Sequence, residues 1–304
     1  MESNAIAIRG VEQHHQHFRL GPINLDIAEG FVTAIVGPNG SGKSSTFRIL
    51  LDLTKPDAGS MTVLGYKVGE GDDREWKRQI GYLPEESSKE DSYLRGSEKA
   101  AFVRQWYDGW DVNLYQDLLK RFEVDDSLKI GKMSKGMRRK FELALVMAHK
   151  PKLLLLDEPS SGLDPIAWKS MIELLHRYME PGDRTILMTS HIVEEVRRLA
   201  DFIVFMVRGQ VLGKYEKDEL FQRWQVLFVA PMNPASPSIS SVLPSAWPGV
   251  VEAEPAGGGM LRIVTENAEL TENALIDMNY RINTRQSLTL DEILDALMRR
   301  GAYV

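Results

Sequence analysis

Residues 37–45 read Gly37-Pro38-Asn39-Gly40-Ser41-Gly42-Lys43-Ser44-Ser45 and contain the pattern G-x-x-x-x-G-K-[ST]. An apolar run at 31–36 precedes this segment, and a helical pattern follows it. In that setting the glycines let backbone N–H groups turn inward around phosphates, and the start of the helix adds partial positive charge. We expect Lys43 to contact the phosphates of a nucleotide and the Ser44 hydroxyl to bind Mg²⁺. The alternative is an ordinary glycine-rich turn between a strand and a helix.

A second signal is the pair of carboxylates Asp157 and Glu158, which directly follows four leucines at 153–156. This pattern places both at the carboxyl end of a buried strand, where ligands of open α/β sheets bind. Asp157 can hold Mg²⁺, and Glu158 can act as a general base on an attacking water. An acidic strand end that faces solvent is the alternative, and the upstream phosphate loop argues against it.

The first two hundred residues alternate strand and helix patterns, which is typical of an α/β fold with a mainly parallel sheet. Apolar runs at 31–36, 153–156, 185–189 and 202–207 predict strands that are buried on both faces. Apolar residues at helical spacing predict a mostly helical insertion over about 85–150.

A third motif occupies residues 132–140 (Lys-Met-Ser-Lys-Gly-Met-Arg-Arg-Lys), where Ser134 is placed to cap a helix. The turn Ser161-Gly162-Leu163-Asp164 follows Glu158, and a single histidine, His191, follows the run at 185–189. In this order the motifs resemble the nucleotide-binding domains of ATP-binding cassette (ABC) transporters. The resemblance covers about residues 4–222.

The resemblance implies a P-loop NTPase (RecA-like) ABC domain over 1–222, with an inserted helical subdomain and with ATP and Mg²⁺ as ligands. It assigns Ser134 and Gly136 to the family signature, which completes the ATP site of the opposite subunit. It assigns Asp164 to the loop that links the two sites and His191 to the switch histidine that contacts the γ-phosphate. Without the family, His191 could be a buried imidazole or a donor that faces the phosphate loop.

Several positions depart from the family pattern. The usual signature Leu-Ser-Gly-Gly-Gln is Met-Ser-Lys-Gly-Met here, so its first glycine and its glutamine are lost. Glu85 stands where a glutamine is usual, and its carboxylate can contact Mg²⁺ but also repels the γ-phosphate. The aromatic residue that normally stacks on adenine aligns with His15, between His14 and His17. A metal site formed by the three histidines and a solvated loop are the alternatives.

Together, the signature, Glu85 and a C-terminal extension resemble one bacterial subgroup, which serves exporters of the acetoin-utilisation and antimicrobial-peptide type. The resemblance implies an ATPase subunit that works as a nucleotide-sandwich dimer, homodimeric or heterodimeric, beneath separate membrane permease subunits. Its expected location is the cytoplasmic face of the membrane. The alternatives are a soluble ABC-class ATPase that acts on nucleic acid or ribosomes, and an importer ATPase with a regulatory C-terminal domain.

The composition limits the classes of function that this chain can have. The chain has 304 residues, with 37 Lys and Arg against 43 Asp and Glu, so its formal net charge of −6 argues against a generally basic nucleic-acid binder. It has no cysteine, so neither disulfides nor thiolate chemistry are available. No signal peptide and no transmembrane-length apolar run are found, so we expect any membrane role to come through a partner.

Residues 223–304 have a different character and predict a small α+β accessory domain. Five prolines between Pro231 and Pro248 predict a long internal loop. We expect two strands and two helices, at 249–254, 260–264, 269–278 and 290–300. Thr289 and Glu292 have capping-box spacing at the start of the last helix. No catalytic motif is present, and we favour a role in dimerisation over ligand sensing.

Two further groups of residues carry no motif. Five aromatics lie close together in sequence, and we expect them to be divided between the core and a surface for the membrane partner. They are Tyr93, Phe102, Trp106, Tyr107 and Trp110. A basic run within 132–140 is interpreted as a solvated face that assists a facing ATP.

Overall fold

The computed structural model describes residues 3–232 and 247–301, which belong to two compact units, Met1–Lys214 and Tyr215–Val304. We expected the boundary after residue 222, but α8 (Lys217–Arg223) lies in the second unit. It does so because α8 packs against α9 (Ala268–Asp277) and buries Leu220. The proline-rich loop predicted at 231–248 falls largely outside the described residues.

The first unit contains a six-stranded sheet in the order β10-β9-β3-β8-β7-β6. Its strands are β3 (Val32–Val36), β6 (Ile80–Leu83), β7 (Leu153–Asp157), β8 (Thr185–Thr189), β9 (Phe202–Val207) and β10 (Gln210–Glu216). β3 pairs in parallel with β8 and β9, and β7 pairs in parallel with β6 and β8. Every residue of β3, β7 and β8 is buried, as the apolar runs predicted. The carboxyl ends of these parallel strands therefore meet at one edge of the sheet.

A second, antiparallel sheet of the first unit has the order β2-β1-β4-β5. Its strands are β1 (Asn4–His15), β2 (Phe18–Ala28), β4 (Ala58–Val63) and β5 (Tyr66–Lys67). One hydrophobic core joins this sheet to α1 (Lys43–Leu50) and to the parallel sheet, through residues such as Ile6, Phe47 and Leu153. The start of α1 is thus fixed by burial of the helix's apolar side chains.

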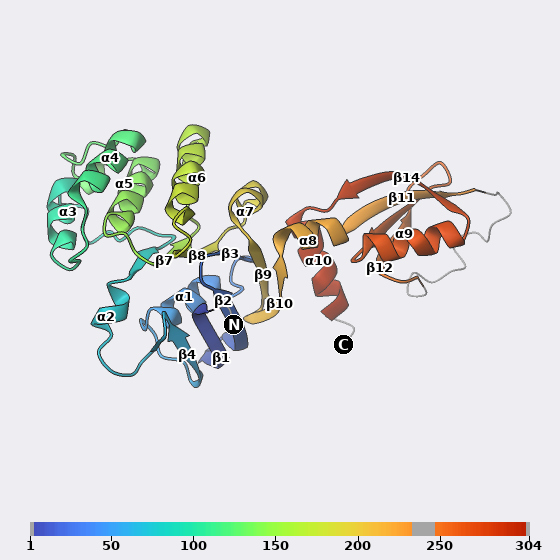
Figure 1. Ribbon diagram of the computed structural model, residues 1–304, viewed down its shortest axis with the longest axis horizontal. Helices are drawn as coiled ribbons and strands as arrows, with labels where there is room; N and C mark the ends of the chain where they lie inside the picture. Colours follow the sequence, from blue (N-terminus) through green and yellow to red (C-terminus); the bar gives the residue numbers. More distant parts are fainter. Residues whose placement is uncertain (1–2, 233–246, 302–304) are drawn as a thin grey trace. The chain divides into compact units, whose positions relative to one another are not determined.

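The predicted helical insertion contains α3 (Gly96–Arg104), α4 (Val112–Phe122) and α5 (Lys135–Met147), which group together in Figure 1. Leu118, Leu119 and Phe122 of α4 are buried, as their helical spacing predicted. Ser134 caps α5 by accepting the N–H of Met137 at 3.2 Å. The other helices of this unit are α2 (Arg74–Lys77), the short 3-10 helix η1 (Ile130–Lys132), α6 (Pro165–Met179) and α7 (Val193–Leu199).

The second unit is built on an antiparallel sheet in the order β12-β13-β11-β14. Its strands are β11 (Gln225–Pro231), β12 (Val250–Pro255), β13 (Leu261–Thr265) and β14 (Tyr280–Ser287). The predicted strands and helices of this region are all present, the helices as α9 and α10 (Leu290–Gly301). The N–H of Thr289 donates to the Glu292 carboxylate at 2.8 Å, which confirms the capping box. β11 and β14 were not predicted.

None of the helices in the described part of the chain combines the length and the apolar character needed to cross a lipid bilayer.

Candidate functional site

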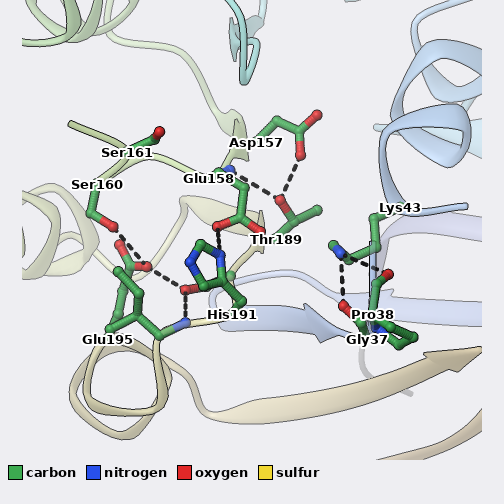
Figure 2. Close-up of polar contacts among 12 residues, drawn as sticks. Gly37, Pro38, Lys43, Asp157, Glu158, Ser160, Ser161, Thr189, His191 and Glu195 are labelled. Atoms are coloured by element: carbon green, nitrogen blue, oxygen red, sulfur yellow. Dashed lines mark hydrogen bonds and ion pairs between the residues drawn. The ribbon is translucent and has the colours of Figure 1, made fainter. Parts of the chain in front are cut away.

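The glycine-rich segment forms a tight loop between β3 and α1. Gly40 and Gly42 have φ angles of 77° and 108°, in the left-handed region that favours glycine. A Cβ atom at Gly37 would stand 2.0 Å from the carbonyl oxygen of Met206, so only glycine fits there. Lys43 donates from Nζ to the carbonyl oxygen of Gly37 at 2.8 Å, as Figure 2 shows. The loop therefore holds this ammonium group against its own backbone.

A cavity of 480 Å³ opens at this loop. Its lining consists of Asn39, Gly40, Ser41, Gly42, Lys43, Ser44 and Ser45 together with Phe18, Glu85 and Glu158. The structure thus brings the phosphate loop together with two predicted carboxylates that lie far away in the sequence. Backbone N–H groups and an ammonium group suit a phosphate ligand, and carboxylates suit a bound cation or a polarised water.

Asp157 is the last residue of β7 and Glu158 directly follows it, and both are at least 95% buried. Thr189, at the end of β8, orders the pair: its hydroxyl donates to Asp157 Oδ1 at 2.6 Å and accepts the Glu158 N–H at 3.0 Å. Glu158 has a φ of 47°, an unusual conformation for a residue with a side chain. This geometry turns its side chain toward the cavity, while Asp157 continues the strand.

His191 contacts the Glu158 carboxylate directly. Its Nδ1 lies 2.7 Å from Glu158 Oε2, and the side chain is 68% exposed (Figure 2). It is therefore not the buried imidazole that we considered from the sequence alone. An exposed ring held by one carboxylate can turn toward a ligand without breaking core packing.

Ser134, Gly136 and Asp164 do not line the cavity of their own chain. Ser134 is exposed at the start of α5, and Asp164 caps α6 by accepting the N–H groups of Ile166 and Ala167. The Ala167 N–H, together with Lys140 and the Ile166 N–H, lowers the pKa of the Asp164 carboxyl, so Asp164 is negatively charged at neutral pH. The two motifs touch each other: a Cβ atom at Gly136 would stand 2.7 Å from the carbonyl oxygen of Gly162.

The aromatic residue at the cavity is Phe18 rather than the expected His15. The two face each other across the β1–β2 pair with ring centroids 6.3 Å apart, but it is Phe18 that approaches Gly42. His15 instead lies 3.0 Å from the Gln13 side-chain oxygen. His14 lies against Asp57, and no group of three or more metal-ligating side chains gathers among the described residues.

The basic run is not a uniformly solvated face. Arg139 is 3% exposed, and its guanidinium donates to the main-chain carbonyls of Pro84, Asp157, Glu158 and Pro159. It thereby connects α5 to the segment before Glu85 and to the end of β7. Sequence reasoning missed this role because Arg139 stands among other charged residues. The only sequence signal for it is the helical period, which turns one position of such a run toward the core.

Comparison with known proteins agrees with this geometry. The family model described as ABC transporter matches residues 20–161. The lantibiotic transport ATP-binding protein SrtF of Streptococcus pyogenes is 34% identical over 221 residues, covering 69% of this chain and 91% of that protein. The chain belongs to the ABC transporter family. The Nod factor export ATP-binding protein I of Rhizobium sp. (strain N33) is 32% identical over 221 residues, covering 70% of this chain and 71% of that protein.

A solved structure supports the same assignment. The ATP-binding subunit of an ABC transporter matches with a TM-score of 0.65 and 26% identity, covering 71% of this chain and 91% of that one. The ABC protein described here is therefore an ATP-binding subunit of this family with the ATPase fold predicted from its motifs. Its activity is ATP hydrolysis.

Proposed function

We propose that this ABC protein hydrolyses ATP to power an exporter whose membrane-spanning subunits are separate chains. The observation that carries the proposal is the shared lining of one cavity by the phosphate loop, Glu85 and Glu158. The export assignment is supported by the names of relatives that act on Nod factor and lantibiotics. The net charge of −6 speaks against the nucleic-acid alternative.

In this proposal the phosphate loop binds the β- and γ-phosphates through its N–H groups and Lys43. Lys43 then exchanges its contact with the Gly37 carbonyl for the phosphates. Glu158 removes a proton from the attacking water, because its carboxylate lines the cavity. His191 leaves Glu158 to donate to the γ-phosphate, and its exposure leaves room for that rotation.

The residues present also fit a bound Mg²⁺. Ser44 and Glu85 present oxygen atoms in the cavity, and Asp157 has one carboxylate oxygen engaged by Thr189, which orients the other. Mg²⁺ would neutralise charge on the phosphates. The Glu85 carboxylate would stand near both the cation and the γ-phosphate, so it attracts one and repels the other.

A second protomer completes the proposed site. Ser134 and Gly136 lie outside their own cavity, and Ser134 is exposed, so they are available to close over the nucleotide of a partner. Lys135 Nζ donates to Ser161 Oγ at 3.0 Å, which couples the signature segment to the turn that ends at Asp164. Closure of the dimer would exclude bulk water from both sites.

A groove of 440 Å³ in the first unit is the proposed contact for a membrane subunit. Its lining includes Leu83, Tyr107, Phe141 and His149, and the Tyr107 and His149 rings stack with centroids 3.9 Å apart. Of the predicted aromatic cluster, Tyr93, Phe102 and Trp106 are exposed, which suits a protein interface. This contact would hold the chain at the cytoplasmic face of the membrane.

We assign the first unit as the ABC ATPase domain and the second as an accessory domain. The second unit has its own core, formed by residues such as Leu227, Ile263 and Leu275. We propose that it holds two protomers together between turnovers, with ligand sensing as the alternative.

Sedimentation with ATP and Mg²⁺ tests the sandwich dimer. A Glu158→Gln variant truncated after Glu216, which lacks the second unit, should bind ATP, fail to hydrolyse it and sediment as a dimer only when ATP is present. Adding Ser134→Arg should prevent the ATP-dependent closure, because a large side chain would enter the interface. A Glu158→Gln protein whose sedimentation and shape do not respond to ATP would contradict the proposal.

A further inference from the structure

A carboxyl group with no assigned role lies behind the catalytic candidates. Glu195, in the first turns of α7, is fully buried at 0% exposure, although its neighbour Glu194 is exposed. Burial of a carboxyl group is costly unless hydrogen bonds compensate for it. The place of Glu195 in the fold therefore needs an explanation beyond filling space.

The contacts of Glu195 join two separate segments. Its Oε2 accepts a hydrogen bond from Ser160 Oγ at 3.3 Å and a second from Ser190 Oγ (Figure 2). Ser160 is two residues after Glu158, and Ser190 directly precedes His191. One carboxylate oxygen thus connects the chain that follows the proposed general base to the chain that carries the proposed switch histidine.

The other oxygen, Oε1, has no hydrogen-bond partner among the described residues. The titratable groups of other elements that interact electrostatically with Glu195 include Glu158 after β7, His191 after β8 and Arg139 of α5. An apolar side chain here would avoid the unpaired Oε1, but it would leave the Ser160 and Ser190 hydroxyls without their acceptor. The carboxyl group is thus better explained by its two hydroxyl contacts than by packing.

Both connected residues depend on their main chain for orientation. Glu158 has a left-handed backbone, and its side-chain direction follows from that conformation. His191 is mostly exposed, so core packing does not hold its ring. Small movements of either segment would therefore displace a reacting group, and displacement of about 1 Å can slow a reaction on the order of 100-fold.

We propose that Glu195 is a positioning residue: through Ser160 and Ser190 it holds Glu158 and His191 in fixed positions relative to each other. The inference rests on the proposed ATPase mechanism. It adds a residue that does not line the cavity but connects the two segments by hydrogen bonds. Glu195 does not touch the nucleotide in this account. Its loss should therefore change the chemical step more than ATP binding.

The test is steady-state ATP hydrolysis by the full chain. Glu195→Ala should lower kcat on the order of 10- to 100-fold and leave the KM for ATP within about two-fold. Glu195→Gln should keep kcat within about three-fold of wild type, because the amide oxygen still accepts hydrogen bonds from both serine hydroxyls. Glu194→Ala, which removes an exposed carboxylate paired with Arg198, is the matched control and should behave as wild type.

A double Ser160→Ala and Ser190→Ala variant removes both hydrogen-bond donors without creating a large cavity. It therefore tests the proposal even if Glu195→Ala does not fold. It should show the same loss of kcat at nearly constant KM. Wild-type kcat in the double variant, or a raised KM with unchanged kcat, would overturn the positioning role. Absence of hydrolysis by the wild-type chain would instead overturn the proposed function, so the two failures are distinguishable.

Discussion

Replacement of Glu195 by glutamine should stabilise the first unit, and the gain should grow with pH. Burial raises the pKa of the Glu195 carboxyl from 4.5 to about 7, against the opposing effect of the Ser190 and Ser160 hydroxyls. The folded protein therefore holds the carboxyl proton more tightly than the unfolded chain does. The stability linked to this proton is fully present below pH 4.5 and is lost as the pH rises through about 7.

The size of the loss follows from the two pKa values. At about 1.4 kcal/mol for each pH unit between them, the free energy of unfolding falls by about 3 kcal/mol. Glutamine is uncharged throughout and avoids this loss. For a unit of this size, the melting temperature of Glu195→Gln relative to wild type should rise by about 6–12 °C between pH 5 and pH 8.

Differential scanning calorimetry at several pH values measures this difference. The transition of the first unit is recognised because ATP shifts it to higher temperature. Glu194→Gln is the matched control, since it makes the same substitution at an exposed position of the same helix. A melting-temperature difference between Glu195→Gln and wild type that stays constant from pH 5 to pH 8 would refute the reasoning.

Three other substitutions or truncations have defined outcomes. Lys43→Ala should weaken ATP binding about 10- to 100-fold by equilibrium dialysis, because a charge-assisted phosphate contact is lost. Glu85→Gln should tighten ATP binding and keep most hydrolysis, because repulsion of the γ-phosphate is relieved; unchanged affinity over a range of Mg²⁺ concentrations would place that carboxylate elsewhere. A chain truncated after Glu216 should still bind ATP but sediment as a monomer without nucleotide, whereas the full chain should be dimeric. Equal dimerisation of both would favour the sensor role of the second unit.

The sequence predicted the parallel sheet and the phosphate loop well, because both depend on local patterns. Strands buried on both faces appear as unbroken apolar runs, and β7 and β8 are such strands. β14 was missed because it is an edge strand whose residues are mostly exposed and polar, so no alternation marks it. β11 contains an apolar run at 226–230 and was missed because that run leads directly into the proline-rich segment.

The parts of the site that were missed depend on tertiary contacts. The choice between His15 and Phe18 is made by the pairing of β1 with β2, whose register contains irregularities. Arg139 and Glu195 look like ordinary surface charges in the sequence, since each stands directly beside other charged residues. Only their burial beside the end of β7 shows that they contact the segments around Glu158.

The rate of ATP hydrolysis by Glu158→Gln, compared with wild type, tests the central claim most directly. The claim is that the carboxylate at the end of β7 acts as the general base on a nucleotide held by the phosphate loop. Wild type should hydrolyse ATP, and Glu158→Gln should bind it with similar affinity while its kcat falls on the order of 100- to 10,000-fold. Hydrolysis by Glu158→Gln at the wild-type rate would contradict the account.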